Sequence, residues 1–262
     1  MKSEFEAAVA AARAAGERLR EKFGRPEEVL TKGSAIDLVT EMDRASEQLL
    51  VEQLGEAFPG YGFLTEESEA IPGRGESRWI IDPIDGTTNY VHGFPYFSIS
   101  IALERAGEVV LGVVYNPIYD ELFSAEKGQG ARLNGKPIYV SRRTELAQSL
   151  VISGFPYDVW TTEKDNLREW SYFLKRVNNV RCNGSAALDL CSIASGRADG
   201  YWERGNKVWD VAAGSLIVRE AGGQATDYQG NDDFIYSQQV AAANPQLHAQ
   251  LLAGLRETGA AR

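Results

Sequence analysis

The sequence predicts an α/β protein whose two halves are built differently, and three patterns lead to this prediction. An amphipathic helical pattern opens the chain, apolar runs joined by short turns follow it, and strand-like and helix-like segments alternate after about residue 142. Such runs favour a mostly antiparallel sheet, and the later alternation is typical of α/β units. We therefore expect an α+β unit over residues 1–142 and an α/β unit over 143–262, packed as one rigid body with a cleft between them.

The first half begins with a helix predicted over residues 3–23. Apolar side chains from Phe5 to Phe23 recur there at steps of three or four residues or their multiples, as on one face of a helix. Residues 44–58 repeat this pattern and end at Pro59. In the run FSISIALE apolar and polar residues alternate, which is typical of a strand with one buried face. Strands are predicted over 61–64, 79–82, 97–104, 108–115 and 121–125.

The second half is predicted as strands that alternate with helices. The predicted strands are 149–155, 178–184, 198–205, 223–228 and 238–244, and the predicted helices are 162–177, 185–194, 211–221 and 246–257. No repeat, low-complexity segment or flexible linker interrupts this order. Trp209 and the small residues Ala212, Ala213 and Gly214 indicate tight packing around Asp210, at the start of the helix predicted from residue 211.

Composition and charge exclude several classes of function. The chain has 262 residues, a formal net charge of -10 and no cluster of Lys and Arg. These features argue against a surface for nucleic acid or an anionic membrane, although cations bound at a site can still attract an anionic substrate. No apolar run reaches the length of a membrane span and no signal peptide is evident, so we expect a soluble, cytoplasmic protein. Cys182 and Cys191 are predicted to be reduced, buried thiols, because their spacing fits no zinc site.

One short string, DPIDGT at residues 82–87, carries the strongest indication of chemistry. It ends an apolar strand, and the proline between its two acids stiffens the backbone. Asp82 and Asp85 can then converge on one hard cation or bridge two, with the carbonyl of Ile84 as a further oxygen ligand, a set that suits Mg²⁺. Gly86 lets a ligand approach the main chain, whose N–H groups can bind phosphate oxygens. The alternative is a strand that ends in a simple Asp-Gly turn.

Further acids lie next to other predicted elements. Glu66 and Glu67 follow an apolar strand, Asp43 precedes the helix predicted from residue 44, and Asp210 precedes the helix predicted from residue 211. Taken singly, adjacent glutamates are most often solvated surface, and an aspartate at a helix start is most often a cap. Taken together, these acids place carboxylates on separate segments beside a Gly-Thr loop, and no nucleophilic Cys or His accompanies them.

The string WIIDPIDGTTNYVHGFP strongly resembles the inositol monophosphatase family of Mg²⁺-dependent, lithium-sensitive phosphatases. The strings DLVTEMD, GFLTEES, GSAALDL and ADGYWERGNKVWDVAAGSLIVREAGG match the family's other signatures in order, and the resemblance spans about residues 30 to 245. It implies a layered α-β-α-β-α sandwich of the sugar-phosphatase type. It also implies a homodimer, inhibition by Li⁺ and a centre of about two to three Mg²⁺ ions.

The resemblance also implies a role for individual residues. Those that look like metal ligands are Glu66, Asp82, Asp85 and Asp210, with the carbonyl of Ile84. Thr87 resembles the hydroxyl that orients the attacking water together with Glu66, and Asp43 resembles the partner that orients Thr87. Those that resemble substrate contacts are Asp85, Gly86, Thr87, Gly184, Ser185, Ala186 and Glu203. Lys32 lies on a stretch that looks like a flap over the metals, Glu67 lies beside the ligands, and Asp189, at a variable family position, receives no role.

These roles imply hydrolysis of a phosphate monoester by in-line attack of water, without a phosphoenzyme. Mg²⁺ would activate the water and stabilise the leaving oxygen. The residues after Thr87 favour myo-inositol monophosphate as the substrate. Fructose 1,6-bisphosphate, NADP(H), histidinol phosphate and nucleotide phosphates stay open, because the main contacts are to phosphate and metal rather than to the alcohol.

Two other classes of protein are alternatives. Haloacid-dehalogenase-type phosphatases also place acids and a Gly-Thr pair after a strand, but their D-x-D spacing sets a nucleophilic aspartate beside the second acid. Here two residues separate Asp82 from Asp85, which favours metal ligation over covalent chemistry. The other alternative is a catalytically inactive binding protein, and the presence of every matched acid argues against it.

Overall fold

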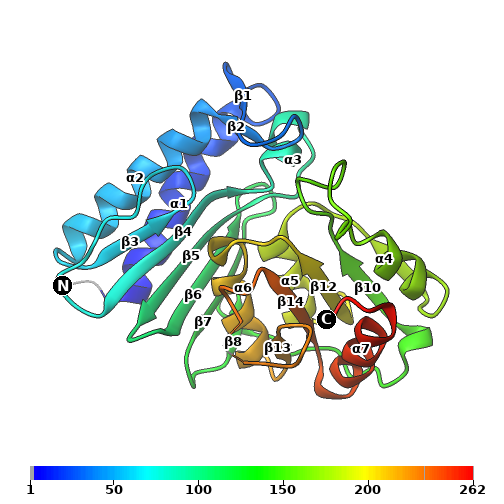
Figure 1. Ribbon diagram of the computed structural model, residues 1–262. Coiled ribbons are helices and arrows are strands. Elements are labelled where there is room, and N and C mark those ends of the chain that lie inside the picture. Colours follow the sequence, from blue (N-terminus) through cyan, green and yellow to red (C-terminus); the bar gives the residue numbers. More distant parts are fainter. Residues whose placement is uncertain (1–2, 233, 262) are drawn as a thin grey trace.

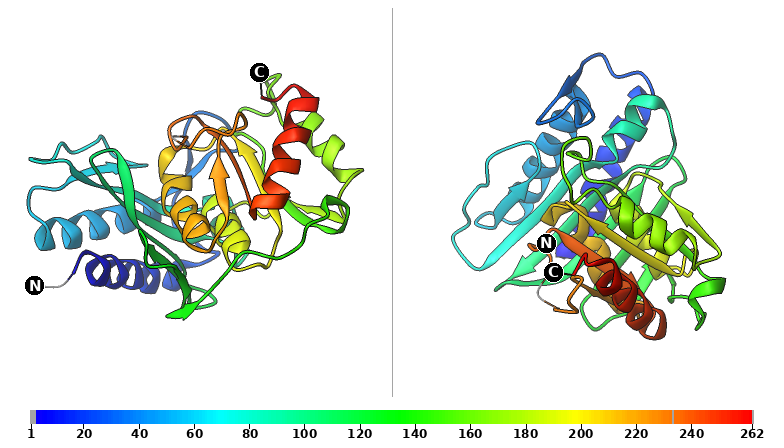
Figure 2. Two further views of the ribbon diagram at one scale, coloured as in Figure 1. Left: turned by 90° about the horizontal axis from the view of Figure 1, so that it is seen from below. Right: turned by 45° about the vertical axis from the view of Figure 1, so that its right-hand side comes forward.

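The computed structural model describes residues 3–232 and 234–261 and contains five layers in the order helix, sheet, helix, sheet, helix (Figure 1). The helices are α1 (Glu4–Lys22), α2 (Glu41–Ala57), α3 (Thr87–His92), α4 (Leu167–Leu174), α5 (Ala186–Ala194), α6 (Val208–Glu220) and α7 (Pro245–Thr258), with a 3₁₀ turn, η1 (Leu146–Gln148). Helices α1 and α2 cover one face of a seven-stranded sheet, and α5 and α6 lie between that sheet and a five-stranded one, whose far face carries α4 and α7. Figure 2 shows α1 and α7 at opposite ends of this stack. The predicted α-β-α-β-α sandwich is confirmed.

The seven-stranded sheet contains the strands predicted in the first half of the chain. In spatial order it consists of β3 (Gly62–Thr65), β4 (Ser77–Asp85), β5 (Ser98–Arg105), β6 (Glu108–Asn116), β7 (Glu121–Glu126), β8 (Ala131–Leu133) and β9 (Lys136–Pro137). Neighbouring strands pair antiparallel, except that β3 and β4 are parallel. The sheet is therefore mostly antiparallel, as predicted, and β8 and β9 extend it beyond the predicted strands.

Strand β5 is buried on both faces, which corrects the prediction of one exposed face. Ile99 and Ile101 pack in the apolar cluster on the α1–α2 side of the sheet. On the opposite side, the Oγ of Ser100 donates a hydrogen bond of 3.1 Å to the carbonyl of Trp209 in α6. Ile99 and Ile101 thus face one helical layer and Ser100 faces the other, so neither face of β5 is open to solvent.

The five-stranded sheet has the order β11 (Asn179–Arg181), β10 (Leu150–Ser153), β12 (Gly200–Arg204), β14 (Gln239–Ala243) and β13 (Gln224–Thr226). Strand β10 pairs parallel with β11 and β12, whereas β14 pairs antiparallel with β12 and β13. The predicted α/β pattern is present in this half. The division into units 1–142 and 143–262 stays a prediction. The central helices α5 and α6 contact both sheets and so connect the two halves.

Helix α4 is shorter than the helix predicted over residues 162–177. Asn166 precedes it with a φ of 68°, a left-handed conformation that cannot continue a helix. The Asn166 amide donates to the Gly154 carbonyl at 2.6 Å, and its oxygen accepts from Trp202 Nε1 at 2.8 Å. These buried contacts hold Asn166 in place, so the helix begins only at Leu167.

Several short elements lie outside the predictions. A hairpin of β1 (Val29–Thr31) and β2 (Leu38–Thr40) precedes α2, and α3 follows β4 directly. Helix α2 starts at Glu41, three residues before its predicted start, because Thr40 is its N-cap. Helix α6 likewise starts at Val208 rather than at residue 211. Within the described residues, no helix combines the length and the apolar character needed to cross a membrane.

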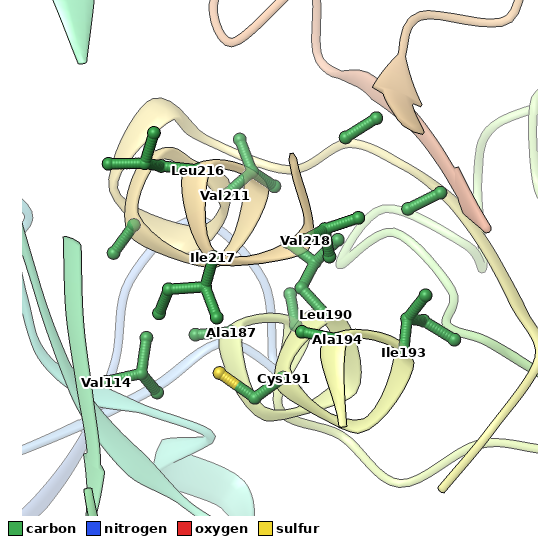
Figure 3. Packing of buried hydrophobic residues seen from close by; sticks show 14 of the residues in the cluster. Val114, Ala187, Leu190, Cys191, Ile193, Ala194, Val211, Leu216, Ile217 and Val218 are labelled. Carbon is green, nitrogen blue, oxygen red and sulfur yellow. The ribbon is translucent and has the colours of Figure 1, made fainter. Parts of the chain in front are cut away.

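The central helices approach each other and the large sheet closely (Figure 3). A Cβ atom on Gly214 of α6 would lie 2.7 Å from the Cβ of Leu190 in α5, so glycine at this position permits the contact. In the same layer, Ile217 and Cys191 point toward Val114 of β6 (Figure 3). Helix α6, which carries Asp210 in its first turn, is therefore rigidly packed on both sides.

Candidate active site

Asp82 and Asp85 come together because strand β4 is irregular at its end. In a regular strand, residues three apart point to opposite faces of the sheet. The register between β4 and β5 shifts between Asp82 and Asp85, and Pro83 lies within this bulge. The Oδ1 of Asp82 also accepts a hydrogen bond of 2.9 Å from the Ile84 N–H, which fixes the turn. Both buried carboxylates consequently line one cavity.

That cavity has a volume of about 430 Å³ and gathers residues from both halves of the chain. The predicted residues that line it are Lys32, Glu66, Asp82, Ile84, Asp85, Gly86, Thr87, Gly184, Ser185, Ala186, Glu203 and Asp210. Two predicted residues, Asp43 and Glu67, do not line the cavity. Asp43 contacts Thr87 and Glu67 contacts Lys32, and both of these partners line it. The first turns of α3, α5 and α6 all open into the cavity, and a helix N-terminus favours anions.

Asp85 joins the loop after β4 to the start of α5. Its Oδ1 accepts from the Ala186 N–H at 3.1 Å, and its Oδ2 accepts from the Ala187 N–H at 2.9 Å and from the hydroxyl of Ser185. Burial raises the pKa of Asp85 to about 6, and these hydrogen bonds limit the rise. The carboxylate thus orders the first turn of α5 and still faces the cavity.

Gly86 allows two backbone segments to meet. It has a φ of 96°, and a Cβ added there would lie 2.8 Å from the carbonyl oxygen of Gly184. The loop before α3 and the loop before α5 are therefore in main-chain contact. This contact places two candidate ligand-binding loops on the same side of the cavity.

Thr87 lies between an acid and a carbonyl. Its Oγ1 is 2.9 Å from Oδ1 of Asp43 and 3.1 Å from the Ile84 carbonyl, and its single proton can bond to one of them at a time. The Oδ2 of Asp43 accepts from the N–H of Thr40 at 2.7 Å. Asp43 is therefore not the N-cap that its position suggested but the third residue of α2, in a capping box with Thr40.

Lys32 extends from the β1–β2 hairpin onto two glutamates. Its Nζ lies 2.7 Å from Oε1 of Glu66 and 2.5 Å from Oε1 of Glu67. Burial raises the pKa of Glu66 to about 7, and the Lys32 charge opposes this rise. The hairpin is also fixed by Ser34, whose hydroxyl donates to the Tyr157 carbonyl at 2.9 Å. Lys32 is thus engaged with the acids rather than solvated.

Asp210 lies in the first turn of α6, where its Oδ2 accepts from the Lys207 N–H at 2.7 Å. Burial raises the pKa of Asp82 and of Asp210 well above the ordinary value, and the negative charge of Glu66 raises both further. Carboxylates that destabilise one another's charge in this way are stabilised by a cation, and a donor set made of oxygen suits Mg²⁺. As the side chains of the described residues stand, no three His, Cys, Asp or Glu could hold an ion, and Lys32 contacts Glu66. The residues present therefore fit a divalent metal through the chemistry of their oxygen donors, provided that their side chains turn toward a common point.

Glu203 projects from β12 into the opposite side of the cavity. Its Oε2 accepts a hydrogen bond of 2.7 Å from the hydroxyl of Tyr201. A Cβ added at Gly154 would lie 2.4 Å from Oε1 of Glu203, so the carboxylate leans directly on the glycine backbone. Burial raises the pKa of Glu203 to about 7. Glu203 is therefore an acid inside the cavity, and its contacts with Tyr201 and Gly154 fix its orientation.

A model of one protein family, the inositol monophosphatase family, matches residues 1–260. The chain belongs to the inositol monophosphatase family. It is 42% identical over 257 residues to the inositol-1-monophosphatase of Mesorhizobium japonicum, which covers 97% of this chain and 96% of that one. It is also 40% identical over 247 residues to the Nus factor SuhB of Pasteurella multocida, with 94% and 92% covered. The solved inositol monophosphatase of Anabaena (Nostoc) superimposes with a TM-score of 0.88 at 40% identity, covering 97% of this chain and 95% of that one.

The family predicted from the motifs is confirmed, and relatives named inositol-1-monophosphatase support a phosphatase enzyme. In this member of the inositol monophosphatase family, the cavity also has a wall that sequence reasoning missed. Phe155, Pro156, Tyr157 and Val159 form it, on the loop that follows β10. No local pattern in that loop indicates a ligand, and only the packing of the two halves brings it over the acids.

The prediction of two buried thiols is wrong for Cys182, which is exposed and lines the cavity. Cys191 is buried, as predicted. Although Cys182 is exposed, its thiol is partly desolvated inside the cavity, and this together with the nearby charges of Glu203 and Asp189 raises the pKa of Cys182 to about 11. A thiol in this state is a poor nucleophile at neutral pH. Cys182 therefore adds no covalent chemistry to the cavity of this protein.

Proposed function

We propose that this protein is a Mg²⁺-dependent phosphatase that hydrolyses myo-inositol monophosphate. One observation supports this most strongly: Asp82, Asp85 and Asp210 lie with Glu66 in one cavity, beside the Gly86-Thr87 loop. Buried acids without a cation destabilise the fold, so their clustering around one cavity indicates a positively charged ligand. A phosphate dianion with its metal ions matches both the acids and the helix N-termini.

The proposed ligands for the metal are the carboxylates of Glu66, Asp82, Asp85 and Asp210 and the carbonyl of Ile84. When bound, Mg²⁺ supplies charge that lowers the pKa of the attacking water and stabilises the leaving oxygen. The N–H groups of Gly86 and Thr87, at the start of α3, are proposed to bind phosphate oxygens. We propose about two to three ions, as in other multi-metal phosphatases.

Thr87 and Asp43 are proposed to orient the water. When the Thr87 hydroxyl donates its proton to Asp43, its oxygen lone pairs are free to accept a hydrogen bond from the water. Glu66, whose carboxylate lines the cavity, is proposed to help accept the water's proton. No residue forms a covalent intermediate in this scheme.

The alcohol of the substrate is proposed to lie between Glu203 and the loop of Gly184, Ser185 and Ala186. These residues offer a carboxylate and main-chain groups, which suit the hydroxyls of a polyol. Fructose 1,6-bisphosphate, NADP(H), histidinol phosphate and nucleotide phosphates are the other substrates to test, since they would use the same phosphate contacts. Relatives named Nus factor and relatives named inositol-1-monophosphatase match this chain about equally well, and the cavity supports the phosphatase role.

The proposal includes inhibition by Li⁺, a homodimer and a cytoplasmic location. Release of phosphate from each candidate substrate with Mg²⁺, with and without Li⁺, tests the activity, and light scattering tests the dimer. We expect the highest kcat/KM with inositol monophosphate and a loss of about 10²-fold or more for Asp82→Asn. Asp199→Asn is the control, because Asp199 is a buried acid that bonds the Leu150 N–H away from the cavity. Wild-type turnover by Asp82→Asn, or no phosphate release from any substrate, would contradict the proposal.

A further inference from the structure

Asp189 lies on α5, one turn after the cavity residues Ser185 and Ala186, and the proposed chemistry does not use it. It is buried, with 1% of its surface exposed. Its Oδ1 accepts a hydrogen bond of 2.7 Å from the side-chain amide of Asn183 and one of 2.9 Å from the hydroxyl of Tyr96. The buried Oδ1 of Asp189 thus connects Asn183, which precedes Gly184, to Tyr96, which lies between α3 and β5.

Asn89 of α3 holds the same loop from its other side. Its Nδ2 lies 2.7 Å from the Asn183 carbonyl, 2.7 Å from the Tyr96 carbonyl and 3.3 Å from the Gly184 carbonyl. Asn183 is therefore bonded through its side chain to Asp189 and through its main chain to Asn89. Tyr96 is likewise bonded through its hydroxyl to Asp189 and through its carbonyl to Asn89, so hydrogen bonds connect the four residues in a closed ring.

The loop needs such a clamp because its own residues do not restrict it. Gly184 adopts a φ of 82° and carries no side chain that could lock it. The first turn of α5 is anchored by Asp85, but the residues before Ser185 are not in a helix or strand. The hydrogen bonds of Asp189 and Asn89 are what connect Asn183 to the packed core.

We propose that Asp189 is a positioning residue that holds the 183–186 loop in the geometry that binds the hydroxyls of the substrate alcohol. This inference rests on the proposed function, in which that loop contacts the alcohol. Asp189 is bonded to Asn183 and Tyr96 and not to the Gly86-Thr87 loop, which is proposed to bind phosphate and which meets the 183–186 loop at Gly184. Loss of Asp189 should therefore disturb the contacts to the alcohol more than the contacts to phosphate. Specificity for a polyol is thus supported by a buried acid behind the cavity.

The test separates binding of the alcohol from binding of phosphate. We expect Asp189→Leu to raise KM for inositol monophosphate roughly tenfold, since a displaced loop loses aligned contacts. For p-nitrophenyl phosphate, which has no ring hydroxyls, we expect KM and kcat within about twofold of the wild type. Asp189→Asn keeps an oxygen that can accept from Asn183 and Tyr96, so it should restore KM for inositol monophosphate. Ser195→Ala, at the other end of α5, is the control and should change neither substrate.

Tyr96→Phe provides a second variant if Asp189→Leu does not fold. It removes one of the two donors to Asp189 and should raise KM for inositol monophosphate in the same selective way, by about threefold. Equal effects on the two substrates would overturn the inference and indicate a purely structural role. Failure of Asp189→Asn to restore KM would overturn it as well. A wild-type protein that releases phosphate from neither compound would instead overturn the proposed function, and this inference with it.

Discussion

The Oγ1 of Thr87 lies 2.9 Å from the Oδ1 of Asp43, so that a hydroxyl from the loop after β4 meets a carboxylate from the first turn of α2. Asp43 is fully buried and also accepts from the Thr40 N–H, which fixes its orientation. Asp43 is therefore a fixed acceptor for the Thr87 hydroxyl before any ligand binds, and the Ile84 carbonyl at 3.1 Å competes with it. Such preorganisation is what a water-orienting group requires.

Loss of the Thr87 hydroxyl should reduce the rate and not the binding of substrate. We expect Thr87→Val to lower kcat by about 10²-fold or more and Asp43→Asn by roughly tenfold, because the asparagine keeps an acceptor without the charge. KM for inositol monophosphate should change little in both variants. Thr258→Val is the control, since this buried hydroxyl donates to the Leu255 carbonyl and accepts from the Ala260 N–H at the end of α7, away from the cavity. A selective rise in KM with unchanged kcat would speak against the role of this pair.

The metal-free protein should lose stability as pH rises toward neutrality. Burial raises the folded-state pKa of Glu66 from 4.5 to about 7, so between these values the folded chain binds more protons than the unfolded chain. The free energy of unfolding therefore falls as pH increases through this window. Thermal unfolding in a chelator should show a lower Tm at about pH 8 than at about pH 5.5.

Mg²⁺ should oppose this loss, because a bound cation stabilises the charged acids. We expect the gap in Tm between the two pH values to shrink when Mg²⁺ is added, and protons to be released on binding near pH 7. Calorimetry in two buffers of different ionisation enthalpy measures that release. A metal-free protein that grows more stable across this pH window would contradict the assigned shifts.

Enlarging Gly154 should disturb Glu203 alone. A Cβ at this position would lie 2.4 Å from Oε1 of Glu203, so the carboxylate has to move away from its bond with Tyr201. We expect Gly154→Ala to raise KM for inositol monophosphate roughly tenfold. Gly75→Ala is the matched control, because a Cβ there meets nothing within 4 Å. Equal KM values for the two variants would exclude Glu203 as a substrate contact.

Substitution of Gly86 should cost both stability and activity. Its φ of 96° strains any other residue, and an added Cβ would lie 2.8 Å from the Gly184 carbonyl. We expect Gly86→Ala to lose about 1–3 kcal/mol of unfolding free energy and most of its activity. Gly107→Ala shares the strain, with a φ of 82°, but its Cβ meets nothing, so it should lose stability and keep activity. If both variants keep activity, the close approach of the two loops is not required for function.

The sequence was sufficient where residues act through their neighbours in the chain. The two-residue spacing of Asp82 and Asp85 and the proline between them predicted a turn with converging acids, and the bulge in β4 is the structure of that turn. Sequence could not predict the early start of α2, because Thr40 and Asp43 form a cap that competes with a strand signal over 38–40. The short α4 could not be predicted for a different reason, because the conformation of Asn166 depends on its contact with Trp202, 36 residues away.

By itself, the sequence determined the α/β class through its periodicity, and the family, with its layered fold and its set of acids, through the resemblance of its motifs. Periodicity and motifs are both local properties of the chain. The tertiary structure alone decided which other residues complete the wall of the cavity and support its loops. The wall of Phe155 to Val159 over the cavity and the bond between Tyr96 and Asp189, 93 residues apart, exist only because the central helices pack between the two sheets. A contact between distant segments depends on the packing of the whole core, which no short pattern in the sequence encodes.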